Sequence, residues 1–499
     1  MMPDTVSPPT PPPGRRPSAT GYLLRLVAGP VVFAAIMAMP FGLSYEGRIA
    51  LATFACAAAW WITQPLPWAV ASMLPFLVFP ATGVKNIGDT MQLYGQPIFF
   101  WIMGTVLMGY AIEKHGLAHR FALAFLALPG VGSRASRLLF TYMLMIGLMS
   151  TVVSDAAAVA MTIPIGMSIV RHLGAMGGSV SGRGTNLAAF ITLGTMYASV
   201  AGGTATMIGV PHNAIAISML ERFTMRQLGF FDWMAVGLPV FVVSLLAFYA
   251  TLWVMARPEI EEVPSGEAFL RAERAKVGRL RSDERRVLFV FVVMIVLFTL
   301  PTFAALFLGG DHDLTRSINR ALPVFVVPPA VMFLLFTIRA ESGGALLSWK
   351  DAEQQTPWNV MLLIAGALAM TDALTEFGFV EWVGGGVRSL GMEASVLPYF
   401  AAAIVAASTN FMAGAAAAAL YSSIFIPAAA EIGYNPASMA ILVANVAIGM
   451  IVPWAGATSA SAFTGGDVTI ERMIKVGIVA TIAFAVVTSI THVLLAGFV

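Results

Sequence analysis

Long runs of apolar residues, separated by short polar turns, occupy most of the chain after its first twenty positions. The stretch from Ile49 to Val84 carries no charge, and "TQPLPWAV" (63–70) interrupts it with two prolines, so it predicts two membrane spans joined by a tight turn. Similar runs recur to the C-terminus. The pattern predicts eleven spanning segments, near residues 22–43, 48–63, 67–83, 97–125, 186–220, 234–256, 286–308, 320–338, 357–388, 436–463 and 473–498.

Two further apolar stretches, 137–171 and 395–430, carry runs of small residues. They predict re-entrant hairpins, which enter and leave the membrane on one side. The expected fold class is therefore an all-α polytopic membrane protein with about eleven transmembrane helices and two re-entrant hairpins. Composition supports this class, because 58% hydrophobic and 11% charged residues leave too little polar surface for a soluble chain of 499 residues.

Hydrophilic segments divide the chain into four parts, a tail (1–20), a first half (21–256), a linker (257–285) and a second half (286–499). The linker is dense in charges of both signs, and we expect it to be helical, solvated and cytosolic. The tail is rich in proline and poor in apolar side chains, which predicts disorder.

Arg15, Arg16 and Arg25 favour a cytosolic N-terminus under the positive-inside rule. A secretory signal is disfavoured, since no small-residue cleavage site is evident and the first apolar run is long enough to span. Six predicted spans precede the linker, and eleven in total place the C-terminus outside. The expected location is the cytoplasmic membrane.

The two halves share one pattern of residues. Gly104 and Gly116 in "WIMGTVLMGYAIEKHGLAHRF" have the same spacing as Gly366 and Gly378 in "MLLIAGALAMTDALTEFGFVEW". Each segment is followed by a hairpin candidate and then by a glycine-broken stretch, "ASVAGGTATMIGVPHNAIA" (198–216) or "AIGMIVPWAGATSASAFTGG" (447–466). Two copies separated by an odd number of crossings are inverted in the membrane, the usual construction of secondary transporters.

The broken stretches predict a ligand site at bilayer depth. An unwound helix frees amide and carbonyl groups, which are tolerated there only around a filled cavity. Helix N-termini favour an anion and free carbonyls favour a sodium ion. In the first stretch three glycines permit unusual dihedrals, one proline removes a donor, and three side chains offer hydrogen bonds; these residues are Gly202, Gly203, Gly209, Pro211, Thr204, Thr206 and Asn213.

The stretch "GGTATMIGVPHNAI" closely resembles the signature of the divalent anion:sodium symporter family, the sodium-dicarboxylate cotransporter group. Its hairpins, its spacing and the second-half "VPWAGATSASAFTGGDVTIERMIKVG" are similar as well. The resemblance covers nearly the whole chain except the tail. It implies a homodimer in which a scaffold domain supports a mobile transport domain that carries substrate across the membrane as an elevator.

The family marks both hairpin tips with a Ser-Asn-Thr motif that helps to bind sodium and the substrate carboxylates. The first tip here reads Ser154, Asp155 and Ala156, and the second reads Ala-Gly-Ala (413–415). Where the family has proline-proline-asparagine, this chain has histidine in the middle, at His212. These departures favour a smaller or less charged anion, or a proton-coupled or exchange mode.

Asp155 stands where the family places a neutral amide. An acid at this tip is able to ligate sodium, to carry a proton, or to pair with a cationic group of the substrate. A structural alternative is that Asp155 only caps a hairpin helix. His212 is either a polar filler or a proton relay. Asn410 bonds either a freed carbonyl or substrate, and Asp372 is expected to be solvated near the end of a span.

The predicted site residues fall into two groups. Those expected to hold the cation are Ser154, Asp155, Gly203, Thr204, Ala413 and Gly456, with Na+ placed at the first three. Those expected to face substrate are Thr206, Asn213, Thr458, Ser459 and Asn410.

Other classes of function are disfavoured. The six histidines show no paired metal spacing with a third ligand in view, and no nucleotide-binding glycine loop appears, so neither an enzyme nor an ATP-driven pump is indicated. A net charge of +2 argues against a nucleic-acid partner.

The expected function is secondary active transport of di- or tricarboxylates or another small anion, coupled to Na+ or H+ and without a cofactor. The alternatives are a cation-independent anion exchanger and a channel-like permease.

Overall fold

The structure, a computed structural model, describes residues 19–39, 42–176, 185–263, 266–309, 311–389, 391 and 393–499. The predicted tail lies outside these residues apart from its last two. The described chain is helical throughout and contains no β-strand, which confirms the expected fold class. The helices that precede the first repeated unit are α1 (Ala19–Ala38), α2 (Tyr45–Thr63), α3 (Trp68–Ala71), α4 (Leu74–Thr82), α5 (Ile87–Gln92) and η1 (Leu93–Gly95).

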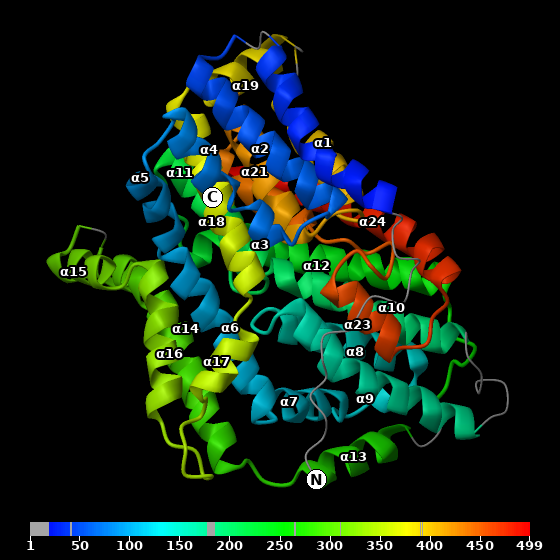
Figure 1. Cartoon of the computed structure of the whole chain (residues 1–499). Coiled ribbons are helices and arrows are strands. Elements are labelled where there is room, and N and C mark those ends of the chain that lie inside the picture. Colours follow the sequence, from blue (N-terminus) through cyan, green and yellow to red (C-terminus); the bar gives the residue numbers. More distant parts are fainter. Residues whose placement is uncertain are drawn as a thin grey trace.

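The two repeats have the same order of elements (Figure 1). The first repeat comprises α6 (Ile98–Lys114), α7 (Leu117–Leu126), η2 (Val131–Ser133), α8 (Ala135–Ser150), α9 (Asp155–Met176), α10 (Asn186–Thr204), α11 (Pro211–Thr224) and α12 (Phe230–Met255). The second repeat comprises α18 (Trp358–Glu376), α19 (Phe379–Ser389), α20 (Leu397–Ser408), α21 (Gly414–Glu431), α22 (Pro436–Val446), α23 (Ala457–Gly465), α24 (Ile470–Leu495) and η4 (Ala496–Phe498).

Between the repeats lie the linker helix and a second set of peripheral helices. They are α13 (Gly266–Val277), α14 (Ser282–Leu308), α15 (Asp313–Ala321), η3 (Val324–Val326), α16 (Val327–Thr337) and α17 (Trp349–Gln355). In Figure 1, α15 projects sideways from α14 and α16, and α13 runs along the lower end of the molecule.

Nine helices of the described chain are long and apolar enough to cross a membrane, or ten if the bent pair Asp313–Ala321 and Val324–Thr337 forms one span. The predicted spans 97–125 and 357–388 are each two helices, α6 with α7 and α18 with α19. The predicted span 67–83 consists of the short helices α3 and α4. Turns therefore divide these three predicted spanning segments into separate helices. The total of eleven spans stays a prediction.

The turns within two of these spans fall at equivalent glycines. Gly116 has φ +80° and Gly378 has φ +83°, a backbone region that disfavours residues with a side chain. In both repeats the chain therefore changes direction one turn after a long apolar helix, and a shorter helix follows.

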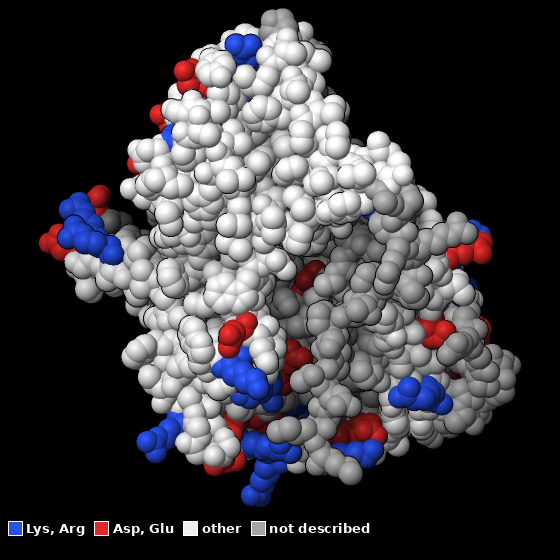
Figure 2. All heavy atoms as spheres, in the orientation of Figure 1, with Lys and Arg blue, Asp and Glu red and all other residues white. Residues whose placement is uncertain are grey.

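The exposed faces of the long helices are apolar. Along α24, the side chains of Ile482, Val486, Ile490 and Leu494 recur every fourth residue and are exposed. Figure 2 shows Lys, Arg, Asp and Glu mainly at the lower end, around α15 and along the upper left edge, with a broad uncharged zone between the upper and the lower charges on this face. An apolar surface of this kind suits contact with the interior of a bilayer.

The linker packs against the first repeat and is not the wholly solvated segment that its charges predict. Leu270 of α13 is buried, and Phe269 stacks on His172 of α9 with ring centroids 4.1 Å apart. Arg120 of α7 donates to the Gly278 carbonyl at 2.8 Å. The linker therefore holds the ends of the first hairpin and of α7 together.

Ion pairs of two lysines join each repeat to the segment that precedes the other. Asp351, before the second repeat, accepts from Lys114 of α6 at 2.8 Å. Lys85, before the first repeat, pairs with Asp372 of α18 at 2.8 Å and with Glu376. Lys114 and Glu376 lie at equivalent positions, ten residues after Gly104 and Gly366, so the two contacts correspond with their charges exchanged.

The two aspartates in these ion pairs are stabilised by different partners. Burial raises the pKa of Asp351, but hydrogen bonds from Lys114 and Ser348 outweigh it and bring the pKa to about 2. Asp372 was expected to be solvated, yet only 8% of it is exposed, and Arg222 of α11 also pairs with it. Asp372 therefore connects α18 to the second part of the first interrupted helix.

Helix α10 lies at the centre of the first repeat. Every residue from Leu187 to Thr204 is buried, because α8, α9 and α12 pack around it. Small residues make this possible, and Gly202 faces the Gly147 carbonyl of α8 in a space that a side chain would fill. The site described below is built from the end of this helix.

The two left-handed glycines provide a test of the repeat geometry. We expect Gly116→Ala and Gly378→Ala each to lower the stability of the folded protein by roughly 1–2 kcal/mol, because alanine is strained at positive φ. Both sites have ordinary space for a methyl group, so strain is the only cost. Thermal unfolding in detergent measures the effect, with Gly344→Ala as the control, since Gly344 has open space and no positive φ. Equal melting of all four proteins would contradict this account.

Candidate functional site

Each predicted hairpin is a helix–turn–helix whose tip lies against an interrupted helix of its own repeat. The first tip (residues 151–154) joins α8 to α9, and the second tip (residues 409–413) joins α20 to α21. The first break (residues 205–210) separates α10 from α11, and the second break (residues 447–456) separates α22 from α23. The glycine-broken stretches thus interrupt helices as the sequence predicts.

Hydrogen bonds fix the first tip to α10 and the first break. Thr206 donates its hydroxyl to the Thr151 carbonyl at 2.5 Å. Ser199 of α10 donates to the Asp155 carbonyl at 2.7 Å and lies 3.2 Å from the Ser150 hydroxyl. The bond from Thr206 satisfies a carbonyl of the turn itself, and the bonds from Ser199 hold the two helix ends that flank the turn.

One polar side chain bridges each break at an equivalent position. Asn213 is fully buried, and its Nδ2 donates to the Gly203 and Thr206 carbonyls, each at 3.0 Å. Ser459, also fully buried, donates to the Gly449 carbonyl at 2.7 Å. Both bonds reach back ten residues, from Asn213 to Gly203 and from Ser459 to Gly449. The two breaks therefore close in the same way.

Asn410 connects the second tip to the second break. Its Oδ1 accepts from the backbone N–H of Ile451 at 2.9 Å and of Met450 at 3.2 Å, and its Nδ2 donates to the Ala406 carbonyl at 2.9 Å. Asn410 was expected to face substrate or to bond the freed backbone. The structure places its amide on the freed backbone groups.

The glycines of the first break serve close approach rather than unusual dihedrals. None of Gly202, Gly203 and Gly209 has a positive φ, which differs from the sequence expectation. A side chain at Gly209 would lie 2.5 Å from the Gly203 carbonyl oxygen. The chain therefore folds tightly back on itself at the break, and the two glycines contact through their backbones.

Asp155 links the two repeats. Its Oδ2 accepts the hydroxyl of Thr458 at 2.6 Å, and its Oδ1 accepts the N–H of Ala156 at 2.8 Å. Asp155 begins α9, and Thr458 is the second residue of α23. The acid therefore both contacts the start of its own helix and joins the tip of one repeat to the break of the other.

The second tip contacts the start of α11 without a side chain of its own. Gly414 begins α21, and a Cβ there would meet the Ala447 carbonyl and would lie 3.6 Å from Nδ1 of His212. Because α21 packs on α11 as α9 packs on α23, this contact is the counterpart of the Asp155–Thr458 contact. One repeat supplies an acid at this position, and the other supplies only backbone.

Three helices begin at the site without a side-chain cap, namely α11, α21 and α23. The first N–H groups of a helix have no partner within the helix and carry the positive end of its dipole. Such helix ends bind carboxylate, sulfate or phosphate groups readily. The arrangement therefore suits an anion.

The remaining predicted residues occupy different environments. Ser154 is half-buried at the first tip, and its hydroxyl bonds no other described residue. Gly456 is exposed at the start of α23, and Ala413 is half-buried at the start of α21. Thr204 is buried and donates to the Ala201 carbonyl of its own helix at 2.7 Å. Of these, Ser154 is the side chain left free for a ligand.

A buried polar group that the sequence analysis did not single out lies at the other end of α22. Both ring nitrogens of His492 are in hydrogen-bond reach, Nδ1 3.1 Å from the Ser438 hydroxyl and Nε2 3.3 Å from the Asn445 amide. In the sequence, the only signal for this group was a histidine within an apolar helix, together with a serine and an asparagine in another apolar segment.

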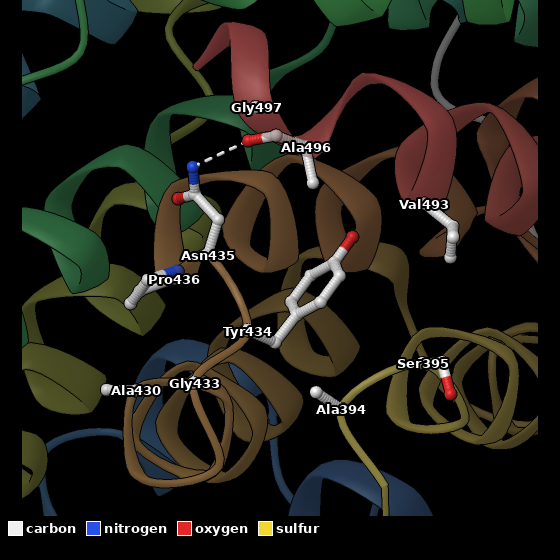
Figure 3. Close-up of a pocket in the computed structure, with 10 residues that line it drawn as sticks. All are labelled: Ala394, Ser395, Ala430, Gly433, Tyr434, Asn435, Pro436, Val493, Ala496 and Gly497. Atoms are coloured by element: carbon white, nitrogen blue, oxygen red, sulfur yellow. Dashed lines mark hydrogen bonds between the residues drawn. The ribbon is translucent and has the colours of Figure 1, made fainter.

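A cavity of 720 Å³ opens nearby, beside Tyr434 and Asn435 (Figure 3), and it is lined mainly by small residues away from the two breaks.

A helical membrane protein in which each of two repeats sets a hairpin tip against an interrupted helix is built as a secondary transporter. A sequence model of the family described as "Sodium:sulfate symporter transmembrane region" matches residues 19–497, and the chain belongs to this family. The transporter class predicted from the sequence is confirmed, and the family is not one of enzymes.

Relatives of known name agree with this assignment. The chain is 26% identical over 474 residues to proteins named sodium-dependent dicarboxylate transporter SdcS from two strains of Staphylococcus aureus, a match that covers 93% of this chain and 89% of each relative. The fold resembles the Alcanivorax borkumensis YdaH transporter, solved by crystallography, with a TM-score of 0.53 and 16% sequence identity, over 85% of this chain and 89% of that one.

The bridge across the first break can be tested at Asn213. We expect Asn213→Asp to lower the stability of the protein by about 1–3 kcal/mol, because the carboxylate cannot donate to the two freed carbonyls. The matched control is Asn359→Asp, at an exposed position where Asn359 makes no hydrogen bond to a described residue. Melting temperature in detergent is the measurement, and a normal melting temperature for Asn213→Asp would show that the bridge contributes little.

Proposed function

We propose that this protein is a secondary active transporter that moves a small carboxylate or another small anion across the cytoplasmic membrane, coupled to Na+ or H+. The observation that carries the proposal is the Asp155–Thr458 contact, at which the tip of one repeat meets the break of the other. The names of the family and of the relatives support a sodium-coupled anion.

The polar groups at the two tips suggest a division of roles. Carboxylate, hydroxyl and carbonyl oxygens are the ligands that a hard cation prefers, and Asp155, Ser154 and the backbone at Gly203 offer them near the first tip. The uncapped starts of α11, α21 and α23 offer only donors, which suit the anion. We assign Thr458 to both parts, since its hydroxyl already contacts the acid.

Three residues predicted to contact ligand are assigned a supporting role instead. The amides of Asn213 and Asn410 and the hydroxyl of Ser459 bond the backbone at the breaks. These contacts hold the breaks in shape, so the residues act by positioning the helix ends. Thr206 fixes the first tip in the same way.

Movement of the site across the membrane is proposed to follow the elevator mode. The same proposal includes four further features. They are the half-chain boundaries at 256 and 286, the inverted relation of the repeats, a cytosolic N-terminus and a homodimer. The ion pairs at Asp351 and Asp372 support it, since they connect the outer segments to α6 and α18 and leave the hairpin tips free of them.

Proton coupling is the second candidate, and the chemistry of Asp155 favours it. An acid at the first tip places negative charge where a dicarboxylate brings more, unless a cation or a proton neutralises it. A cation-independent exchanger is the remaining alternative.

Uptake by proteoliposomes separates these candidates. Labelled succinate and sulfate are offered to the wild type and to Asp155→Asn, with sodium and proton gradients imposed separately. If Asp155 ligates sodium, a sodium gradient drives uptake, and the substitution weakens the apparent affinity for sodium by about tenfold or more. If Asp155 carries a proton, only a proton gradient drives uptake and Asp155→Asn is insensitive to external pH.

The control variant is Asp311→Asn, which removes an equally sized acid at a fully exposed position. It is expected to transport as the wild type does. Uptake that neither gradient drives but that internal unlabelled substrate accelerates would identify an exchanger. Failure of both probes under every gradient, with an ungated ion current, would replace the transporter by a channel.

A further inference from the structure

The two contacts between repeats are equivalent by position. Ten residues separate Gly203 from Asn213 and Gly449 from Ser459, and both pairs are hydrogen-bonded across their breaks. The residue before each bridging side chain is His212 in the first repeat and Thr458 in the second. The first residue of the second hairpin helix is Asp155 in one repeat and Gly414 in the other. His212 with Gly414 is therefore the counterpart of Thr458 with Asp155.

The imidazole of His212 occupies the region that a side chain at the second tip would enter. Its Nδ1 lies 3.6 Å from the Cβ position of Gly414. A side chain at Gly414 is also blocked by the Ala447 carbonyl, so the tip and the second break are in backbone contact there. The second tip therefore offers no side-chain ligand at Gly414, and the imidazole of His212 lies beside this position.

His212 is buried without being satisfied. Only 8% of the residue is exposed, and its Nε2 has no hydrogen-bond partner among the described residues. A polar group left buried and unpaired is costly, and native proteins usually provide a partner. If His212 were only a polar filler, as the sequence analysis allows, it would need such a partner within the protein. The described chain supplies none at Nε2.

The surroundings of His212 identify the partner as an acceptor with negative charge. His212 is the second residue of α11, and Gly414 is the first of α21; neither helix has a side-chain cap. Both helix ends carry positive partial charge. In the tautomer that carries its hydrogen on Nε2, the imidazole adds one more donor to this group. An anionic oxygen is the kind of acceptor that suits each of these donors.

We propose that His212 binds the anionic group of the transported substrate, through its Nε2–H, beside the N-terminus of α21. The inference rests on the proposed function and adds a contact to it. It also orients the substrate, because the other pair contains the acid Asp155, which is hydrogen-bonded to Thr458, the counterpart of His212. The anionic end lies at His212, and the end facing Asp155 is neutral or is accompanied by a cation.

The test compares two substitutions that differ in one property. His212→Phe keeps a planar ring and removes the donor, whereas His212→Gln keeps an N–H donor on a side chain without a ring. The control is His119→Phe, at an exposed position on α7. Binding of succinate and of sulfate is measured by calorimetry in detergent, together with the KM for succinate uptake and the melting temperature.

We expect His212→Phe to weaken binding and raise KM by about 10- to 100-fold, with a normal melting temperature, because a hydrogen bond to a charged group is lost. His212→Gln is expected to recover most of the affinity, and His119→Phe to match the wild type. Wild-type affinity in His212→Phe would overturn the inference. So would an equal loss in both variants when His212→Gln melts as the wild type does.

The outcome for the wild type separates this inference from the proposed function. If the wild type neither binds nor transports either probe under any gradient, the proposed function fails, and the inference fails with it. If the wild type transports and His212→Phe changes only the melting temperature, the proposed function stands and His212 is a structural residue.

Discussion

The architecture depends on one constraint, which is that backbone amide and carbonyl groups need partners wherever a helix stops inside the membrane. Two helices stop in this way, at residues 205–210 and 447–456. Asn213, Ser459 and Asn410 form hydrogen bonds to backbone groups at the breaks, and glycines let the backbone pack closely on itself. What stays unanswered is a set of helix N-termini, and these lie where the hairpin tips meet the breaks.

The two repeats solve this problem in the same way but with different ligand chemistry. At the first tip an acid accepts a hydroxyl from the opposite repeat, while at the second tip the equivalent residue is a glycine beside a buried imidazole. A symmetric scaffold therefore encloses an asymmetric site. The first tip offers a carboxylate at this position, and the second tip offers only backbone.

Much of the fold could be predicted from the sequence, because hydropathy and glycine spacing report directly on burial and on backbone turns. The hairpins, the breaks and the repeat order follow from them. The positions of Asn410 and Asp372 could not be predicted, because each depends on which distant segment faces it: Ile451 for the amide, Lys85 and Arg222 for the acid. The helix divisions at Gly116 and Gly378 fall inside segments that the sequence analysis takes as single spans, although charged residues such as Lys114 and Glu376 stand two positions before these glycines.

The exchanged charges at the base of the repeats make the two halves complementary. Lys114 of one repeat faces Asp351, whereas Glu376 at the equivalent position faces Lys85. Two copies of the first half would set lysine against lysine, and two copies of the second would set acid against acid. Each half therefore carries the charge that complements the other half, and the ion pairs form only when the two unlike halves are joined.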